Sequence, residues 1–212
     1  MPIKLIAPPE IEPVSIAEQK SQMKVTYNSE DSLIGGFIMA ARQLIENLTG
    51  IRMMEQSCQL LLDGFPCSRS DDGLMHRQNH LHGRQIVFPV APVSAVSEVR
   101  YLDRAGGSHL FPADQYLVDC DSIPGRIILK ESASWPHWDL AAAQSVVISF
   151  TAGYGDEAKD VPEPLRLAVK LLAAHYFNNR EAVIVAGGTL TVQELPLGIQ
   201  QLITPYMLWR RD

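Results

Sequence analysis

Apolar residues recur at helical spacing near the N-terminal end of the chain. From residue 31 to residue 48 they return every three or four positions, which predicts one long amphipathic helix. Ser29 is predicted to cap this helix, Asp31 lies in its first turn where an acidic side chain is favourable, and Gly50 ends it. The pair Gly35-Gly36 weakens a helix interior; it indicates either a point where another backbone approaches closely, which is slightly favoured, or a tolerated weak point.

A shorter helix is predicted just before the long one. Ser15 and Glu18 have the spacing of a capping box, so a helix is expected from about residue 16 to residue 25. Residues 6–14 contain three prolines, which supply no backbone donor and disfavour helix. We expect that segment to be an extended arm or the edge strand of a sheet.

Helical spacing returns near the C-terminal end. The prolines of segment 161–164 suit the first turn of a helix that is expected to run to about residue 178. Residues 182–195 are rich in valine, glycine and threonine, which is compatible with either a flexible loop or a hairpin. A final short helix is predicted over residues 196–203.

Between residues 52 and 154 the pattern changes to short alternating or apolar runs separated by turn residues, which is typical of β-structure. Residues 103–108 have the glycines of a hairpin turn, and residues 66–83 form a polar segment interpreted as an exposed loop. Six strands are predicted: residues 58–62, 85–88, 96–102, 116–118, 126–129 and 145–150.

These elements predict an α+β fold. Neither helical end has enough apolar faces to enclose a core alone, so the two ends are expected to pack together. The prediction is a helical domain of residues 1–52 plus 156–212, with an inserted antiparallel β module of residues 53–155.

Composition excludes several classes of protein. Hydrophobic residues make up 46% and charged residues 20% of the chain, which is ordinary for a globular protein. The net charge of −6 and the lack of a Lys/Arg cluster argue against tight, sequence-independent binding of nucleic acid. Cys58, Cys67 and Cys120 show no CxxC spacing and are interpreted as free thiols in a reducing cytosol. No signal peptide or membrane-spanning run is recognised, so no membrane association is expected.

Candidate reactive groups do not form a convincing active site. The histidines His76, His80 and His82, near Asp71 and Asp72, have ligand-like spacing but no regular element to hold a metal, so we interpret them as a solvated loop. Asp119 and Asp121 are interpreted as turn carboxylates. No serine lies in a nucleophile elbow, and residues 151–155 are too short for a phosphate-binding loop. We therefore expect no catalytic residue, no metal and no cofactor.

Aromatic residues offer two candidate binding surfaces. Trp135 and Trp138 could anchor a ligand or a partner, but the favoured interpretation is that they cover one end of the β module's core. The tail with Trp209, Arg210 and Arg211 combines residue types that are enriched in binding hot spots, against the alternative of a frayed terminus.

Taken in order, short motifs along nearly the whole chain resemble the head-tail connector, or head-completion adaptor, proteins of long-tailed bacteriophages and prophages. No single motif is specific, but their ordered succession is hard to obtain by chance. The polar segment 66–83 departs from the family pattern. The motifs are residues 13–20, 31–50, 62–66, 87–93, 99–103, 152–155, 161–168 and 178–181, and the match ends near residues 202–206.

The resemblance implies a structural, non-enzymatic virion protein, made in the cytoplasm of the bacterial host. Its expected partners are copies of itself in a ring, the portal protein and tail-side completion proteins, with DNA passing transiently and non-specifically. A closed ring needs two different complementary patches on each subunit, and the helical domain is the candidate for them. The residues predicted to form the assembly interface are Arg180, Leu190, Val192, Tyr206, Trp209, Arg210 and Arg211.

Two rival functions stay open from the sequence. The first is a small-ligand or carbohydrate-binding β module whose mouth is lined by Trp135 and Trp138. The second, ranked lower, is an enzyme with a site where the helices meet the β module. A cleft with titratable groups of perturbed pKa would favour either rival over the connector.

Overall fold

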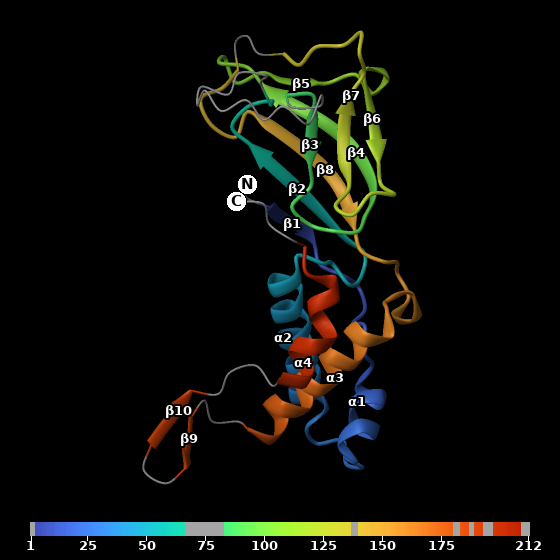
Figure 1. Cartoon of the computed structure of the whole chain (residues 1–212), viewed down its shortest axis with the longest axis vertical. Helices are drawn as coiled ribbons and strands as arrows, with labels where there is room; N and C mark the ends of the chain where they lie inside the picture. The colour runs from blue at the N-terminus through green and yellow to red at the C-terminus, as the bar shows by residue number, and fades with distance from the viewer. Residues whose placement is uncertain are drawn as a thin grey trace. The chain divides into compact units, whose positions relative to one another are not determined.

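The computed structural model describes residues 3–66, 83–136, 140–179, 183–186, 189–192 and 197–208. The chain divides into two compact units, each made of two separate stretches of sequence (Figure 1). The β unit consists of Met1–Pro8 and Glu55–Gly153, and the helical unit of Pro9–Met54 and Tyr154–Asp212.

The β unit holds two antiparallel sheets. The larger sheet has five strands, in the spatial order β1 (Ile3–Ala7), β2 (Gln56–Leu62), β8 (Val146–Ala152), β4 (Val93–Leu102) and β5 (Ser108–Leu110). The smaller sheet has three, in the order β3 (Gln85–Val87), β7 (Arg126–Leu129) and β6 (Tyr116–Asp119), with a 3-10 turn η1 (Ala113–Gln115) before β6.

Side chains of alternating strand positions form the core of the β unit. In β2 and β8 every second residue is buried, which is the expected result of a pleated strand with one face turned inward. Phe88 of the chain after β3 packs on Phe150 of β8, with ring centroids 4.7 Å apart. Trp135 is only 3% exposed and stacks on Phe65, so its predicted place in the core is confirmed.

The helical unit contains α1 (Ile16–Met23), α2 (Asp31–Thr49), α3 (Glu163–Asn178) and α4 (Leu197–Ile203), with 3-10 turns η2 (Ala158–Asp160) and η3 (Thr204–Tyr206). The long helix α3 contacts each of the other three helices. Between α3 and α4, β9 (Val183–Ala186) pairs antiparallel with β10 (Thr189–Val192). The unit is built around buried aliphatic side chains, among them Ile34, Ile38, Ile45, Leu165 and Leu172.

Several sequence predictions are confirmed. The fold is α+β, with helices from both ends of the chain and antiparallel strands between them. Ser15 and Glu18 form the predicted capping box of α1, and Gly50 ends α2 with a positive φ of 78°. Of the two possibilities for residues 182–195, the hairpin is the one that the described strands show.

Other predictions are wrong in detail. Glu30, not Ser29, is the N-cap of α2, and it makes no side-chain capping bond. A Cβ at Gly35 would make ordinary contact with Ile16 at 3.7 Å, and one at Gly36 would meet nothing within 4 Å, so no backbone presses on this pair. The first eight residues belong to the β unit, not to the helical segment to which we assigned them, because β1 pairs with β2 along the sheet edge.

None of the described helices is both long enough and apolar enough to cross a bilayer.

Candidate assembly surfaces

The structure describes three of the seven predicted interface residues. Leu190 and Val192 lie in β10, opposite Val185 and Val183 of β9, and the description there covers the backbone alone. Tyr206 lies in η3 and is partly buried. The other four, Arg180, Trp209, Arg210 and Arg211, lie outside the described residues.

Tyr206 belongs to a segment that is anchored within the helical unit. The backbone N–H of Leu208 donates to the carbonyl oxygen of Thr49, at 2.8 Å, which joins the chain after η3 to the end of α2. Burial raises the pKa of Tyr154, and the neighbouring Tyr206 raises it further, so the two phenols lie close together. The chain is therefore held in place as far as Leu208.

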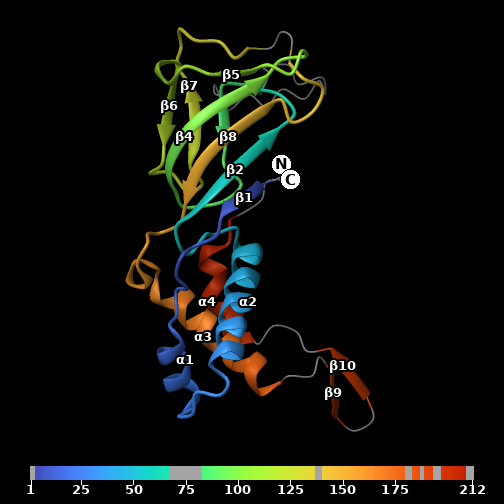
Figure 2. The same ribbon diagram turned by 180° about the vertical axis from the view of Figure 1, so that it is seen from behind.

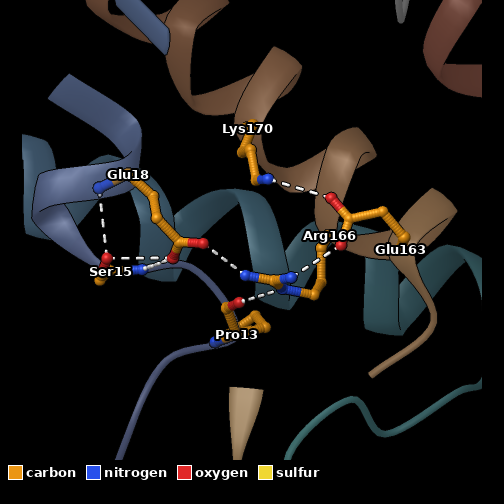
Figure 3. A network of polar contacts seen from close by, with 6 residues as sticks. All are labelled: Pro13, Ser15, Glu18, Glu163, Arg166 and Lys170. Carbon is orange, nitrogen blue, oxygen red and sulfur yellow. Dashed lines mark hydrogen bonds and ion pairs between the residues drawn. The ribbon is translucent and has the colours of Figure 1, made fainter. Parts of the chain in front are cut away.

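Paired charges connect α1 to α3 (Figure 3). Arg166 of α3 is their centre: its guanidinium donates to a carboxylate oxygen of Glu18 at 2.6 Å, to Glu163 at 2.7 Å and to the carbonyl oxygen of Pro13 at 2.9 Å. Lys170 reaches the second oxygen of Glu163 at 3.1 Å. Two stretches that are far apart in sequence, residues 13–18 and α3, are thus joined by one cation.

The pKa values of these carboxyl groups reflect this pairing. The pKa of Glu18 is lowered, chiefly because its carboxylate accepts the backbone N–H of Ser15 and also faces Arg166. The pKa of Glu163 is lowered, chiefly by its hydrogen bond to Lys170. Both groups therefore favour the charged form, so each carboxylate at this site is matched by a donor or a cation.

A second charge cluster is buried against α2. Arg42 and Glu46, one turn apart, pair at 3.0 Å, and their side chains are 5% and 4% exposed. Burial disfavours the charge of Arg42, but its hydrogen bonds to Glu12 and the charge of Glu46 outweigh this and raise its pKa. Glu46 also accepts the backbone N–H of Met53 at 2.9 Å. Through this cluster, the proline-rich segment before α1 and the chain after α2 are both hydrogen-bonded to helix α2.

The outer face of α2 has a different character. With Arg42 and Glu46 turned inward, the only charged side chain of α2 that is partly exposed is Asp31 in the first turn, which pairs with Lys20. We call this surface the α2 face; its residues are Ser32, Leu33, Gly36, Met39, Ala40, Gln43, Asn47 and Leu48. The exposed residues of α4 and η3 are likewise uncharged, and we call them the α4 face: Gly198, Gln200, Gln201, Thr204 and Pro205.

Sequence reasoning missed both the buried cluster and the two faces. The sequence alone did not show the α2 face, because Arg42 and Glu46 are among the non-apolar positions of this helix and only the structure shows that both are buried. No signal was available for the pairing of Arg42 with Glu12, which are thirty positions apart.

The structure describes only some of the residues that the sequence offered as candidate reactive groups. Asp119 accepts hydrogen bonds from Ser122 and Arg126, and these lower its pKa, with Ser122 the main cause; it is the turn carboxylate that we predicted. Among the described residues, no group of three or more His, Cys, Asp or Glu side chains could hold a metal ion. His76, His80, His82, Asp71, Asp72 and Trp138 lie outside the described residues.

The buried position of Trp135 weakens the carbohydrate-binding alternative. Its indole N–H donates to the carbonyl oxygen of Gly83 at 3.1 Å, and its ring stacks on Phe65 with centroids 4.8 Å apart. A tryptophan that is 3% exposed has no face left for a sugar.

Comparison with known proteins confirms the predicted resemblance. Residues 139–207 match the model of the phage gp6-like head-tail connector protein family. This stretch includes β8, α3, the β9–β10 pair and α4. No curated protein matches the sequence significantly.

The whole chain is similar in fold to chains in three solved structures of gene transfer agent particles. They are the neck of an empty particle computed with C6 symmetry (TM-score 0.76, 23% identity), the virion of a native particle (0.73, 22%) and the neck of a native particle computed with C12 symmetry (0.73, 24%). In each comparison the match covers 99% of this chain and 97% of the other. Both units are therefore present in these chains.

Proposed function

We propose that this chain, whose residues 139–207 match the phage gp6-like head-tail connector family, is a structural protein of the neck of a phage or phage-like particle. The observation that carries the proposal is the agreement of two independent comparisons: a connector family match over residues 139–207 and a whole-chain likeness to chains of particle necks. The role is one of assembly, with no catalytic step.

In this role several copies form a ring between the portal and the tail, completing the head and leaving a path for DNA. Cyclic symmetry in two of the similar neck structures supports a ring. Each subunit of a closed ring must offer two different patches, because the contact is head-to-tail. The net charge of −6, repeated around a channel, would keep DNA from adhering to the wall. Tight binding of duplex DNA by the purified ring at physiological salt would contradict that part of the proposal.

The portal contact is proposed to use the β9–β10 pair and the C-terminal tail. The seven predicted interface residues lie in these segments or next to them: Arg180, Leu190, Val192, Tyr206, Trp209, Arg210 and Arg211. The hydrogen bond that holds Leu208, two residues after Tyr206, to the end of α2 supports this. If the β9–β10 pair and the C-terminal tail make their contacts only when a portal is present, the connector binds only after the portal has formed, so assembly is sequential.

Deletion of the gene in the host that produces the particles tests the proposal. We expect heads that contain DNA but carry no tails, visible by electron microscopy, and restoration of tails by a wild-type copy supplied in trans. Normal tailed particles from the deletion strain would contradict a role in the neck.

A further inference from the structure

The α2 face is an unusual surface for a helix of a free-standing protein. Eight exposed residues over nineteen positions include Leu33, Met39 and Leu48, exposed by 38%, 47% and 46%, and no charged side chain. Protein surfaces normally intersperse charges with apolar residues, whereas interfaces are depleted of Lys, Glu and Asp and enriched in Met. The composition of the α2 face is that of an interface.

The α4 face has the matching property. From Gly198 to Pro205 the chain contains no charged residue, and the exposed members offer amide and hydroxyl groups through Gln200, Gln201 and Thr204. Gln43 and Asn47 of the α2 face carry the same amide groups. Amides both donate and accept, so two such surfaces can satisfy each other without charge.

The helices that carry the two faces lie on opposite sides of the helical unit. Helix α3 contacts both α2 and α4. Figure 1 shows α4 nearer the viewer than α2, and Figure 2, turned by 180°, shows α2 in front. A head-to-tail contact that closes a ring needs this arrangement, in which the patch on one side of a subunit meets a different patch on the other side of its neighbour.

Several charged side chains that the structure describes in the helical unit lie outside the two faces and are paired within the chain. Arg166 and Lys170 pair with Glu18 and Glu163 between α1 and α3, and Arg42 pairs with two carboxylates in the interior. Copies with a net charge of −6 repel one another, so a contact between copies is favoured where neither surface carries a charge.

We propose that the α2 face of one copy of this chain packs on the α4 face of the next copy, and that this contact, repeated, closes the ring. The inference rests on the proposed function, which calls for a ring of identical chains but does not say which surfaces meet. A Cβ placed at Gly36 or at Gly198 would meet no atom within 4 Å, so both faces leave room for a neighbouring chain to come close.

Two substitutions place a charge in each face separately. Met39→Glu changes the α2 face and Gln201→Glu changes the α4 face; both positions are exposed, and glutamate is a good helix former. Gln22→Glu is the matched control, because it adds the same charge at an exposed position of α1, outside both faces. Circular dichroism confirms that each variant keeps its helices.

The readout is the mass of the purified full chain by sedimentation velocity, across a wide range of protein concentration. We expect the wild type and Gln22→Glu to form a discrete oligomer, and Met39→Glu and Gln201→Glu each to shift to monomer. The sharper test mixes the two variants. A Met39→Glu copy retains an intact α4 face and a Gln201→Glu copy an intact α2 face, so the mixture is expected to form dimers and nothing larger.

Oligomers of Met39→Glu or Gln201→Glu equal to those of the wild type would overturn the inference, as would a mixture that stays monomeric. A wild-type chain that is monomeric at every concentration would also overturn it. None of these results decides whether the chain belongs to the neck, because the particles of the deletion strain answer that question separately.

Discussion

At the scale of single residues, the helical unit is held by a few charged side chains that each join distant segments. Arg166 connects α3 to Glu18 and to the carbonyl of Pro13, and Arg42 connects α2 to Glu12. Such pairs contribute most when they are buried, because removing one partner leaves the other charge without compensation in the interior.

Arg42→Ala should therefore destabilise the helical unit strongly. It leaves the carboxylate of Glu46, with a side chain 4% exposed, without its main cation. We expect the free energy of unfolding to fall by about 3 kcal/mol. Urea unfolding followed at 222 nm measures this, with the exposed neighbour substitution Gln43→Ala as control, expected within about 0.5 kcal/mol of wild type. A loss below about 1 kcal/mol for Arg42→Ala would show that Glu46 does not need Arg42.

Folding lowers the pKa of Glu18 and of Glu163 from the ordinary glutamate value of 4.5. Their stabilisation is thus complete above that pH and is lost as the pH falls through the folded-state pKa values. We expect the stability of the helical unit to decline with acidification below about pH 4.5, and Glu18→Gln to make this decline shallower. Glu10→Gln, at an exposed position, is the control. An unchanged pH profile in Glu18→Gln would contradict the role given to that carboxylate.

Interactions between residues that are close in sequence could be predicted from the sequence. The capping box of Ser15 and Glu18 spans three positions and was read directly from the sequence. The Arg42–Glu12 and Arg166–Pro13 contacts span thirty and more than one hundred positions, and only the tertiary fold brings these residues together.

At the scale of elements, hydrophobic periodicity predicted all four helices and six of the strands closely. The strand β5 was missed because its three residues are all exposed and show no alternation. The start of α2 was placed at Ser29 on composition, whereas the chain enters the helix at Glu30 without a side-chain cap. The end of α2 was predictable, since glycine is favoured where φ is positive.

Two glycine substitutions in α2 should act in opposite directions. Gly50→Ala forces a left-handed conformation on alanine and places its Cβ 3.1 Å from Leu208, so we expect a loss of about 1–2 kcal/mol. Gly36→Ala meets no atom and improves helix propensity, so a gain of about 0.5–1 kcal/mol is expected. Thermal unfolding at low protein concentration measures both. Equal effects of the two substitutions would refute the account of Gly50.

At the scale of the whole molecule, the sequence predicted an inserted β module but not the partner of the first strand. The pairing of β1 with β2 joins residues more than fifty positions apart, and an extended proline-rich segment could equally have been a free arm. The strand order of the sheets was likewise beyond sequence reasoning, because register and neighbours depend on contacts across the whole unit.

Deletion of residues 1–8 should weaken the β unit and spare the helical unit. The truncated chain loses β1 and leaves β2 as an unpaired edge. With Trp209→Phe in place, fluorescence reports only Trp135 and Trp138, both in the β unit, while ellipticity at 222 nm follows the helices. We expect the fluorescence transition to move to lower urea and the ellipticity transition to stay. A shift of the ellipticity transition alone would show that β1 supports the helices instead.

We propose that this chain forms a ring in the particle neck and docks on the portal. The most direct test of this proposal is the mass measured by light scattering for the purified chain mixed with the portal protein of the same particle. The account predicts a discrete complex whose mass equals that of the portal assembly plus a whole number of copies of this chain. A chain that remains at monomer mass and leaves the portal unchanged would contradict it.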